Sequence, residues 1–200
     1  MKSYLALGDS YTIGEGELLI NNFPNLLVSK INANTNLFKS PKIIAKTGWT
    51  TDELISAIHE ADLSEAPYDL VSLLIGVNNQ YRNYPLTQFV NEFEQLLKKA
   101  IGFSKNGSQG VFVVSIPDWG NTTFAADKDK VAISTAIDAY NQVVQQISSQ
   151  YQCAFIDITA HTRQKNAIPD FLVEDGLHYN KEAHINWITS IYNSIKESHF

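Results

Sequence analysis

The sequence predicts a three-layer α/β sandwich, in which helices cover both faces of a parallel, five-stranded sheet. Short apolar runs alternate with longer segments of helical spacing along all 200 residues, and this alternation is typical of parallel sheets with helical crossovers. The run over residues 70–75 is almost wholly apolar, as expected for a central strand that is covered on both faces. A chain of this length can bury one sizeable core, so we expect a single domain over residues 1–200.

The first part of the chain predicts two strand–helix units. A strand is expected over residues 4–7, and a helix over residues 23–31, where Pro24 suits the first helical turn. A second strand is expected over residues 42–45. The second helix is expected over residues 51–61, because it starts with capping and acidic residues.

Three further units complete the predicted order of five strands and five helices. The remaining strands are expected over residues 70–75, 110–116 and 153–158, and the remaining helices over residues 86–103, 130–151 and 181–196. The first of these helices has its apolar residues at helical spacing, at Phe89, Phe93, Leu96, Leu97 and Ala100. In such folds ligands bind outside the carboxyl ends of the strands, so a functional motif should directly follow a strand.

Four short polar motifs meet this condition. Gly-Asp-Ser-Tyr at residues 8–11 follows the first strand, and Thr-Gly-Trp at residues 47–49 follows the second. Gly-Val-Asn-Asn at residues 76–79 follows the third strand, and Asp-Gly-Leu-His at residues 175–178 lies between the fifth strand and the last helix. Because the carboxyl ends of parallel strands share one edge of the sheet, we expect the four motifs to meet there.

The residue types in these motifs suit nucleophilic catalysis. Ser10 is a weak nucleophile until a base takes its proton, and His178 can be that base because imidazole titrates near neutrality. A carboxylate must then orient the imidazole, and Asp175 is close enough in sequence to do so. The backbone N–H groups of Ser10 and Gly48, with the side-chain amide of Asn78, are candidate donors to an oxyanion.

On these residues the sequence resembles the SGNH hydrolases, also called GDSL esterases and lipases. The four residues in the family's name match Ser10, Gly48, Asn78 and His178, and the family's carboxylate matches Asp175. The resemblance runs in order from residue 8 to residue 178. It implies a flavodoxin-like sheet with strand order 2-1-3-4-5 and a catalytic mechanism that needs no cofactor. One departure is Tyr179, where the family often has proline.

Each motif has a simpler interpretation when it is taken alone. Gly-Asp-Ser is an ordinary turn sequence, and a lone glycine such as Gly48 is more often a turn residue than an oxyanion donor. The pair Asn78 and Asn79 could be a polar loop or cap a short helix. Asp-Gly at residues 175–176 is a common turn, and His178 could be a surface histidine. The main α/β-hydrolase signature is absent at Ser10, because position 12 is Thr and not Gly. The catalytic hypothesis therefore depends on the four motifs occurring together, in order, at strand ends.

Several residues beside these motifs are candidates for substrate binding. They are Trp49, Asn79, Tyr81, Arg82 and Trp119. The two tryptophans could equally cap the core beneath the loops, and the arginine could instead pair with a nearby acid. We expect Asp9 to organise the turn around the serine, and the irregular segment 162–174 to form part of the pocket wall.

Composition and charge exclude several other classes of function. The formal net charge is -6 and no Lys/Arg cluster is visible, so we expect no nucleic-acid partner. Cys153 is the only cysteine, which rules out an internal disulfide and a cysteine-based zinc site. The remaining histidines are interpreted as structural, with no metal site: His59 and His184 in helices, His161 in a polar loop and His199 at the end of the chain.

No stretch of the sequence reaches the roughly 18 apolar residues of a membrane span. The first residues also lack the apolar region of a signal peptide, so we expect a cytoplasmic protein, or an exported one if a leader was removed. The expected partner is a small-molecule ester, and the oligomeric state is left open.

Together these features predict a serine esterase that hydrolyses carboxylic esters through an acyl-enzyme. Three enzymatic alternatives use the same residues: a carbohydrate deacetylase, a thioesterase and a lysophospholipase. The alternative from another class is a non-catalytic, flavodoxin-like binding module. Such a module has no need of all three of Ser10, Asp175 and His178, so the sequence favours the hydrolase.

Overall fold

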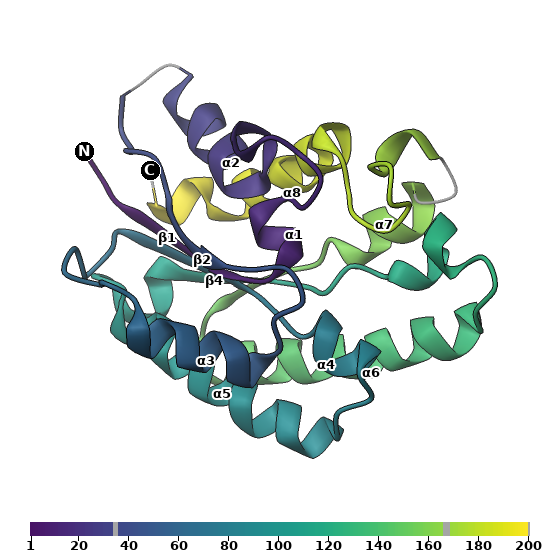
Figure 1. Ribbon diagram of the computed structural model, residues 1–200. Helices are drawn as coiled ribbons and strands as arrows, with labels where there is room; N and C mark the ends of the chain where they lie inside the picture. Colours follow the sequence, from purple (N-terminus) through teal and green to yellow (C-terminus); the bar gives the residue numbers. More distant parts are fainter. Residues whose placement is uncertain (34–35, 166–168, 200) are drawn as a thin grey trace.

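Five parallel strands form the central sheet of the protein, seen here in a computed structural model that describes residues 1–33, 36–165 and 169–199 (Figure 1). The strands are β1 (Tyr4–Gly8), β2 (Lys42–Ala45), β3 (Leu70–Leu74), β4 (Val111–Val114) and β5 (Ala154–Ile156). Their order is β2-β1-β3-β4-β5, and every neighbouring pair is parallel. The predicted fold class and strand order are therefore confirmed.

The inner strands explain why the sequence has such continuous apolar runs. All residues of β1, β3 and β4 are buried, because helices cover the sheet on both faces. In the pairing register, Leu7 of β1 lies opposite Ile44 of β2 on one side and Leu73 of β3 on the other. A parallel strand in this position has no face toward solvent, so its sequence is almost wholly apolar. The exception is Ser72 of β3, which is buried with its Oγ 2.7 Å from the hydroxyl of Tyr4.

Helices pack on both faces of this sheet. Figure 1 shows α2 and α8 on one face, and α3, α5 and α6 on the other. The α-helices are α1 (Ser10–Ile13), α2 (Phe23–Asn32), α3 (Thr51–Glu60), α4 (Val77–Tyr81), α5 (Leu86–Gly102), α6 (Lys130–Gln150), α7 (Thr159–Lys165) and α8 (Lys181–His199). Short 3₁₀ helices are η1 (Leu19–Asn21), η2 (Gly107–Gly110), η3 (Trp119–Asn121), η4 (Thr123–Ala125) and η5 (Pro169–Phe171).

The long helices form where the sequence predicts them, with ends that differ by a few residues. The apolar positions named above for α5 are all buried, which is the reason its helical spacing is so clear. Three short helices, α1, α4 and α7, are additional to the five expected helices; only near Asn78 and Asn79 was a short helix considered, as the simpler alternative. They begin at or close to strand ends, where polar motif residues give no apolar periodicity, and the first is capped by Asp9, whose carboxylate accepts from the N–H of Tyr11.

Two expectations for the region after β5 need correction. His161 lies in α7 and not in a polar loop, and its Nε2 is 3.1 Å from Ser190 Oγ of α8. The segment 162–174 was expected to be irregular, but its first residues continue α7 as far as Lys165. Residues 166–168 of that segment lie outside the described residues.

The turn from β1 into α1 requires glycine at position 8. A Cβ atom there would collide with Thr12 Oγ1 and with the carbonyl oxygen of Leu74. The short helix α1 thus folds back tightly over the end of β1, and Ser10 becomes its first residue. The close approach of backbone to backbone is possible only without a side chain.

We therefore expect Gly8→Ala to lower the free energy of unfolding by about 1–3 kcal/mol, the usual cost of inserting an atom into a packed site. Urea unfolding followed by circular dichroism measures this. Gly102→Ala is the matched control, because nothing lies within 4 Å of a Cβ at the end of α5. Equal stability of Gly8→Ala and the natural chain would contradict this account of the turn.

Candidate active site

The four strand-end motifs meet at the carboxyl edge of the sheet. Ser10 begins α1 directly after β1, Gly48 follows β2, Asn78 lies in α4 after β3, and His178 lies just before α8. A cavity of about 190 Å³ opens between them. Its lining residues are Ser10, Tyr11, Thr47, Gly48, Val77, Asn78, Tyr81, Trp119, Phe124, Leu177 and His178.

An unbroken series of hydrogen bonds joins three of the motif residues. Ser10 Oγ is 2.9 Å from His178 Nε2, and His178 Nδ1 is 2.6 Å from Asp175 Oδ2. A carboxylate can only accept, so Nδ1 carries a proton, and in the neutral ring Nε2 is then the acceptor for the serine hydroxyl. Ser10 and His178 are only 4% and 9% exposed, so little water competes for these bonds.

The loop that carries Asp175 and His178 is held together by the same carboxylate. Asp175 Oδ1 accepts from the backbone N–H of Leu177 at 2.8 Å and from that of His178 at 2.9 Å. Partial burial alone would raise the pKa of Asp175, but its hydrogen bonds from the ring and the two backbone groups lower that pKa below the ordinary value. The carboxylate is thus ionised at neutral pH and faces the imidazole.

Two further motif residues present donors from fixed positions. Asn78 Nδ2 donates one hydrogen to the carbonyl of Trp49 at 2.9 Å, which leaves the second hydrogen of the same amide for a ligand. Gly48 has φ of +85°, a left-handed conformation that favours glycine. Arg82 Nη2 donates to the carbonyl of Gly48 at 2.6 Å, so the peptide at this turn is held from behind.

Asp9 is fully buried in the nucleophile motif, and no cation among the described residues pairs with it. Its Oδ1 accepts from the N–H of Tyr11 at 3.0 Å, and its Oδ2 is buried with no hydrogen-bond partner in the described part of the chain. Burial raises the pKa of Asp9 to about 7, against the lowering effect of its backbone hydrogen bonds, of which that from Tyr11 is the strongest. Asp9 organises the turn around Ser10, as the sequence suggested.

The outer wall of the cavity is aromatic. The ring of Trp119 packs edge-on against Tyr81 with centroids 5.3 Å apart and lies 6.1 Å from Phe124. Trp119 is almost fully buried, and its Nε1 donates to Gln80 Oε1 at 2.7 Å. Tyr81 and Phe124 remain 48% and 40% exposed, so they form a rim between the cavity and solvent.

Only two of the five residues predicted to bind substrate line the cavity, Tyr81 and Trp119. Trp49 is half-buried and packs against the core, which was the alternative considered for it. Arg82 lies behind Gly48 and pairs loosely with Glu53 at 3.4 Å, as its own alternative proposed.

The prediction for Asn79 needs correction. Its side chain is fully buried, and both ends of its amide are bonded to Thr51, the first residue of α3. Asn79 therefore joins α4 to α3 and has no surface for a ligand. Phe171 and Leu172 of the segment 162–174 likewise pack against the core and are not among the cavity residues.

Sequence reasoning missed five cavity residues, namely Tyr11, Thr47, Val77, Phe124 and Leu177. The first three and the last belong to the four strand-end motifs but were given no role there, so their place in a motif was the available signal. Phe124 has no such signal, because it lies in the segment between β4 and α6, which carries no recognisable motif.

One histidine outside the cavity has a clearly structural environment. His184 of α8 is buried, stacks on Trp187 with ring centroids 4.7 Å apart, and has a pKa that burial lowers to about 4. The described residues include no group of three or more His, Cys, Asp or Glu side chains that could hold a metal ion. In the same part of the chain, no helix is long and apolar enough to cross a membrane.

Comparison with known proteins identifies the family. The model of the GDSL-like lipase/acylhydrolase family matches residues 6–184, which is most of the chain. The protein therefore belongs to this family, as its resemblance to the SGNH hydrolases indicated, and is a hydrolase of carboxylic esters.

Individual relatives are distant in sequence. Over 191 residues the chain is 23% identical to the acetylxylan esterase of Geobacillus stearothermophilus, covering 92% of this chain and 79% of that protein. Among solved structures it is similar to TesA, with a TM-score of 0.76, 16% identity and coverage of 98% and 99%. It is also similar to the psychrotrophic esterase EstA from Pseudoalteromonas sp., with a TM-score of 0.75, 19% identity and 98% of each chain covered. These structural likenesses show the fold.

The environment of Asp9 predicts a pH dependence of stability. Between its ordinary pKa of 3.8 and its raised value of about 7, the folded protein keeps a proton at Asp9 that the unfolded chain has released. The free energy of unfolding therefore falls as pH rises through this window, by at most about 1.4 kcal/mol per pH unit.

Asp9→Asn keeps an acceptor for the N–H of Tyr11 and cannot ionise, so it should lose this part of the dependence. Urea unfolding of both proteins across the window measures the difference between them, in which the contribution of His184 is common to both and cancels. Parallel stability curves would contradict a raised pKa at Asp9.

Proposed function

We propose that the chain acts as a single domain and cleaves its ester through a covalent acyl-enzyme on Ser10, with His178 as general base and Asp175 as the carboxylate that orients the imidazole. The observation that carries the proposal is the continuous hydrogen bonding from Asp175 to His178 (2.6 Å) and from His178 to Ser10 (2.9 Å). A serine hydroxyl needs this series, because it becomes a strong nucleophile only when an oriented base removes its proton.

The reaction proceeds in two halves. Ser10 Oγ attacks the carbonyl carbon of the ester and transfers its proton to His178 Nε2. The tetrahedral intermediate then collapses, the bond to the alcohol oxygen breaks, and His178 returns the proton to the leaving alcohol. In the second half His178 takes a proton from water as the water oxygen attacks the acyl carbon. His178 then returns this proton to Ser10 Oγ as the bond between Ser10 and the acyl group breaks and the acid is released. No cofactor takes part in these steps.

The negative charge of each intermediate is stabilised by preorganised donors. The N–H of Ser10 belongs to the first turn of α1, where backbone N–H groups have no intrahelical acceptor. The N–H of Gly48 and the second amide hydrogen of Asn78 supply the other donors. Donors that are already oriented need no rearrangement when the charge develops, and each contributes about 2.7–4 kcal/mol to transition-state stabilisation.

The substrate that this cavity suits best is an ester with a small acyl group. Its volume of about 190 Å³ and its aromatic wall leave little room beside the serine. A carbohydrate deacetylase is the second candidate, favoured by the half-exposed rings of Tyr81 and Phe124 at the rim and by the likeness to an acetylxylan esterase. Flat aromatic rings at a rim suit ligands that are apolar on one side and polar at their edges.

Ser10→Ala should abolish hydrolysis of p-nitrophenyl acetate, with a fall in kcat of at least about 10⁴-fold, because the attacking atom is lost. Release of nitrophenolate measures the rate, and circular dichroism checks that the variant folds. Ser56→Ala, at an exposed serine of α3, is the matched control and should keep full activity. Full activity in Ser10→Ala would contradict the proposed nucleophile, and an inactive natural chain would favour the binding module instead.

A substrate panel separates the enzymatic candidates. We expect kcat/KM to be highest for acetyl esters and acetylated xylo-oligosaccharides, because the cavity is small, and at least about tenfold lower for long acyl-CoA thioesters and lysophospholipids. Acid release measured by pH-stat follows all four classes in one assay. A preference for either long-chain class would replace the small-ester proposal with a thioesterase or a lysophospholipase.

A further inference from the structure

The aromatic wall of the cavity is carried by one segment after β4. Residues 117–125, called here the wall segment, include both Trp119 and Phe124 and contain the short helices η3 and η4. Two 3₁₀ turns have few internal hydrogen bonds, so contacts with the rest of the fold must fix the position of the segment.

The first of these contacts is made by Asp118, at the start of the wall segment. Its side chain is fully buried. Oδ1 accepts from the N–H of Gly120 at 2.9 Å, Oδ2 accepts from Asn121 Nδ2 at 3.2 Å, and the backbone N–H of Asp118 donates to Thr162 Oγ1 of α7 at 3.1 Å. This carboxylate therefore holds Gly120 and Asn121, the two residues that follow Trp119 in η3.

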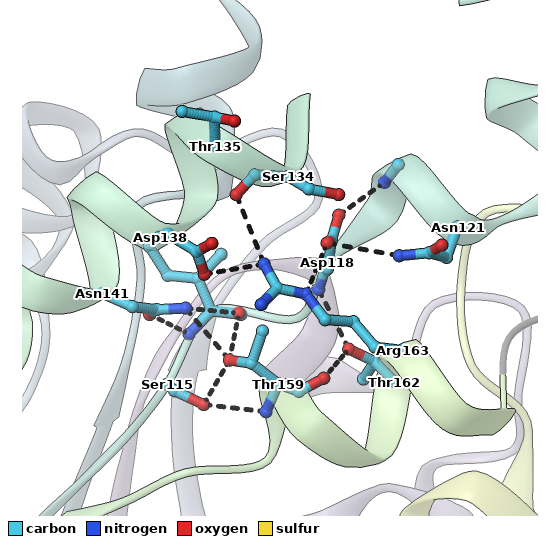
Figure 2. Close-up of polar contacts among 12 residues, drawn as sticks. Ser115, Asp118, Asn121, Ser134, Thr135, Asp138, Asn141, Thr159, Thr162 and Arg163 are labelled. Atoms are coloured by element: carbon cyan, nitrogen blue, oxygen red, sulfur yellow. Dashed lines mark hydrogen bonds and ion pairs between the residues drawn. The ribbon is translucent and has the colours of Figure 1, made fainter. Parts of the chain in front are cut away.

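A buried carboxylate is costly unless a cation pairs with it, and Arg163 of α7 supplies the cation. Its Nε donates to Asp118 Oδ2 at 2.8 Å, while its Nη2 donates to Asp138 Oδ1 at 2.7 Å and to the carbonyl of Ser134 at 3.3 Å. Figure 2 shows the guanidinium reaching from α7 between Asp118 on one side and Asp138 of α6 on the other. One side chain thus joins the wall segment to two helices.

The far end of the wall segment is tied to the loop of His178. Phe124 donates through its N–H to the carbonyl of Gly176 at 2.9 Å, and Thr123 Oγ1 donates to the same carbonyl at 3.1 Å. Gly176 lies between Asp175 and His178 in sequence. The segment therefore runs from the anchor at Arg163 to the loop that carries the base, with Trp119 between them.

We propose that Arg163 and Asp118 are positioning residues that fix the aromatic wall and thereby set the size of the ester group that the cavity accepts. The inference rests on the proposed function, since it concerns substrate choice at Ser10. Neither residue lines the cavity. They act through the backbone that carries Trp119. The indole ring itself is held by the hydrogen bond from its Nε1 to Gln80 of α4.

Removing the guanidinium leaves the buried carboxylate of Asp118 without the cation that faces it, which is strongly unfavourable. The wall segment relieves this by moving Asp118 toward water, and Trp119 moves with it. The cavity then widens, so bulky esters gain relative to acetate. A misplacement of about 1 Å far from the reacting atoms can cost about 10²-fold in rate, so acetate itself should also be hydrolysed more slowly.

The test measures two ratios of kcat/KM. The first compares p-nitrophenyl octanoate with p-nitrophenyl acetate, and the second compares acetate esters of bulky alcohols with acetate esters of small alcohols. A merely structural role would lower the fraction of folded enzyme, and that fraction cancels in each ratio. For Arg163→Met we expect at least one ratio to rise about tenfold or more, the scale on which a pocket discriminates by size. Arg163→Lys, which cannot form the planar fork, should lie between Arg163→Met and the natural chain.

Two further variants keep the test decisive. Asp138→Ala removes the exposed partner of Arg163 and leaves Asp118 paired, so it should shift the same ratio in the same direction by a smaller factor even if Arg163→Met does not fold. Lys105→Met is the matched control. Lys105 pairs at 2.9 Å with Asp69, whose carboxylate also accepts a backbone N–H, so this variant also removes the cation from a hydrogen-bonded carboxylate. This ion pair lies at the amino-terminal edge of the sheet, opposite the cavity. The ratios of Lys105→Met should equal those of the natural chain.

Ratios within about twofold of the natural chain in a folded Arg163→Met would overturn the inference, as would an equal shift in Lys105→Met. If Arg163→Met does not fold, ratios within about twofold in both Arg163→Lys and Asp138→Ala would overturn it. In that event a natural chain that still hydrolyses esters through Ser10 would leave the proposed function standing. If the natural chain hydrolysed none of these esters, the proposed function and the inference would both fail.

Discussion

The hydrogen bond between His178 and Ser10 joins residues that are 168 positions apart in the chain, and the remaining structure is what makes it possible. Parallel strands bring their carboxyl ends to one edge of the sheet, so β1 delivers Ser10 and the loop before α8 delivers His178 to the same place. Glycine at position 8 lets α1 fold back sharply over β1. The buried and almost wholly apolar inner strands form the rigid base from which these polar residues project.

Three aspartates organise this polar edge in the same way and differ in their counter-charge. Asp9, Asp118 and Asp175 each accept the backbone N–H two residues later, from Tyr11, Gly120 and Leu177, an arrangement typical of Asx turns. Asp175 faces an imidazole and keeps a lowered pKa. Asp118 faces a guanidinium. No cation among the residues that the structure describes pairs with Asp9, and burial raises its pKa. The same local turn thus supports the base His178 at Asp175, the aromatic wall at Asp118 and the nucleophile Ser10 at Asp9.

The sequence predicted the strands and the central site residues because each had two independent signals. Ser10 and Asn78 follow apolar runs that could only be buried strands, and their side chains suit one chemistry. The fate of Asn79 could not be predicted in this way, because it is the same residue type as its neighbour and only the turn of α4 decides which amide is buried. The role of Arg163 depends on where α7 packs, and Phe124 on a segment without periodicity, so neither had a signal before the fold was known.

The central claim is that Ser10 is the nucleophile and that His178 activates it. A fluorophosphonate probe followed by peptide mass spectrometry tests this most directly, because the phosphorus forms a stable bond only with an activated hydroxyl. The account predicts one adduct, on the peptide that contains Ser10, and labelling at least about 10³-fold slower in His178→Ala. An adduct on another residue, or equally fast labelling of Ser10 without the imidazole, would contradict it.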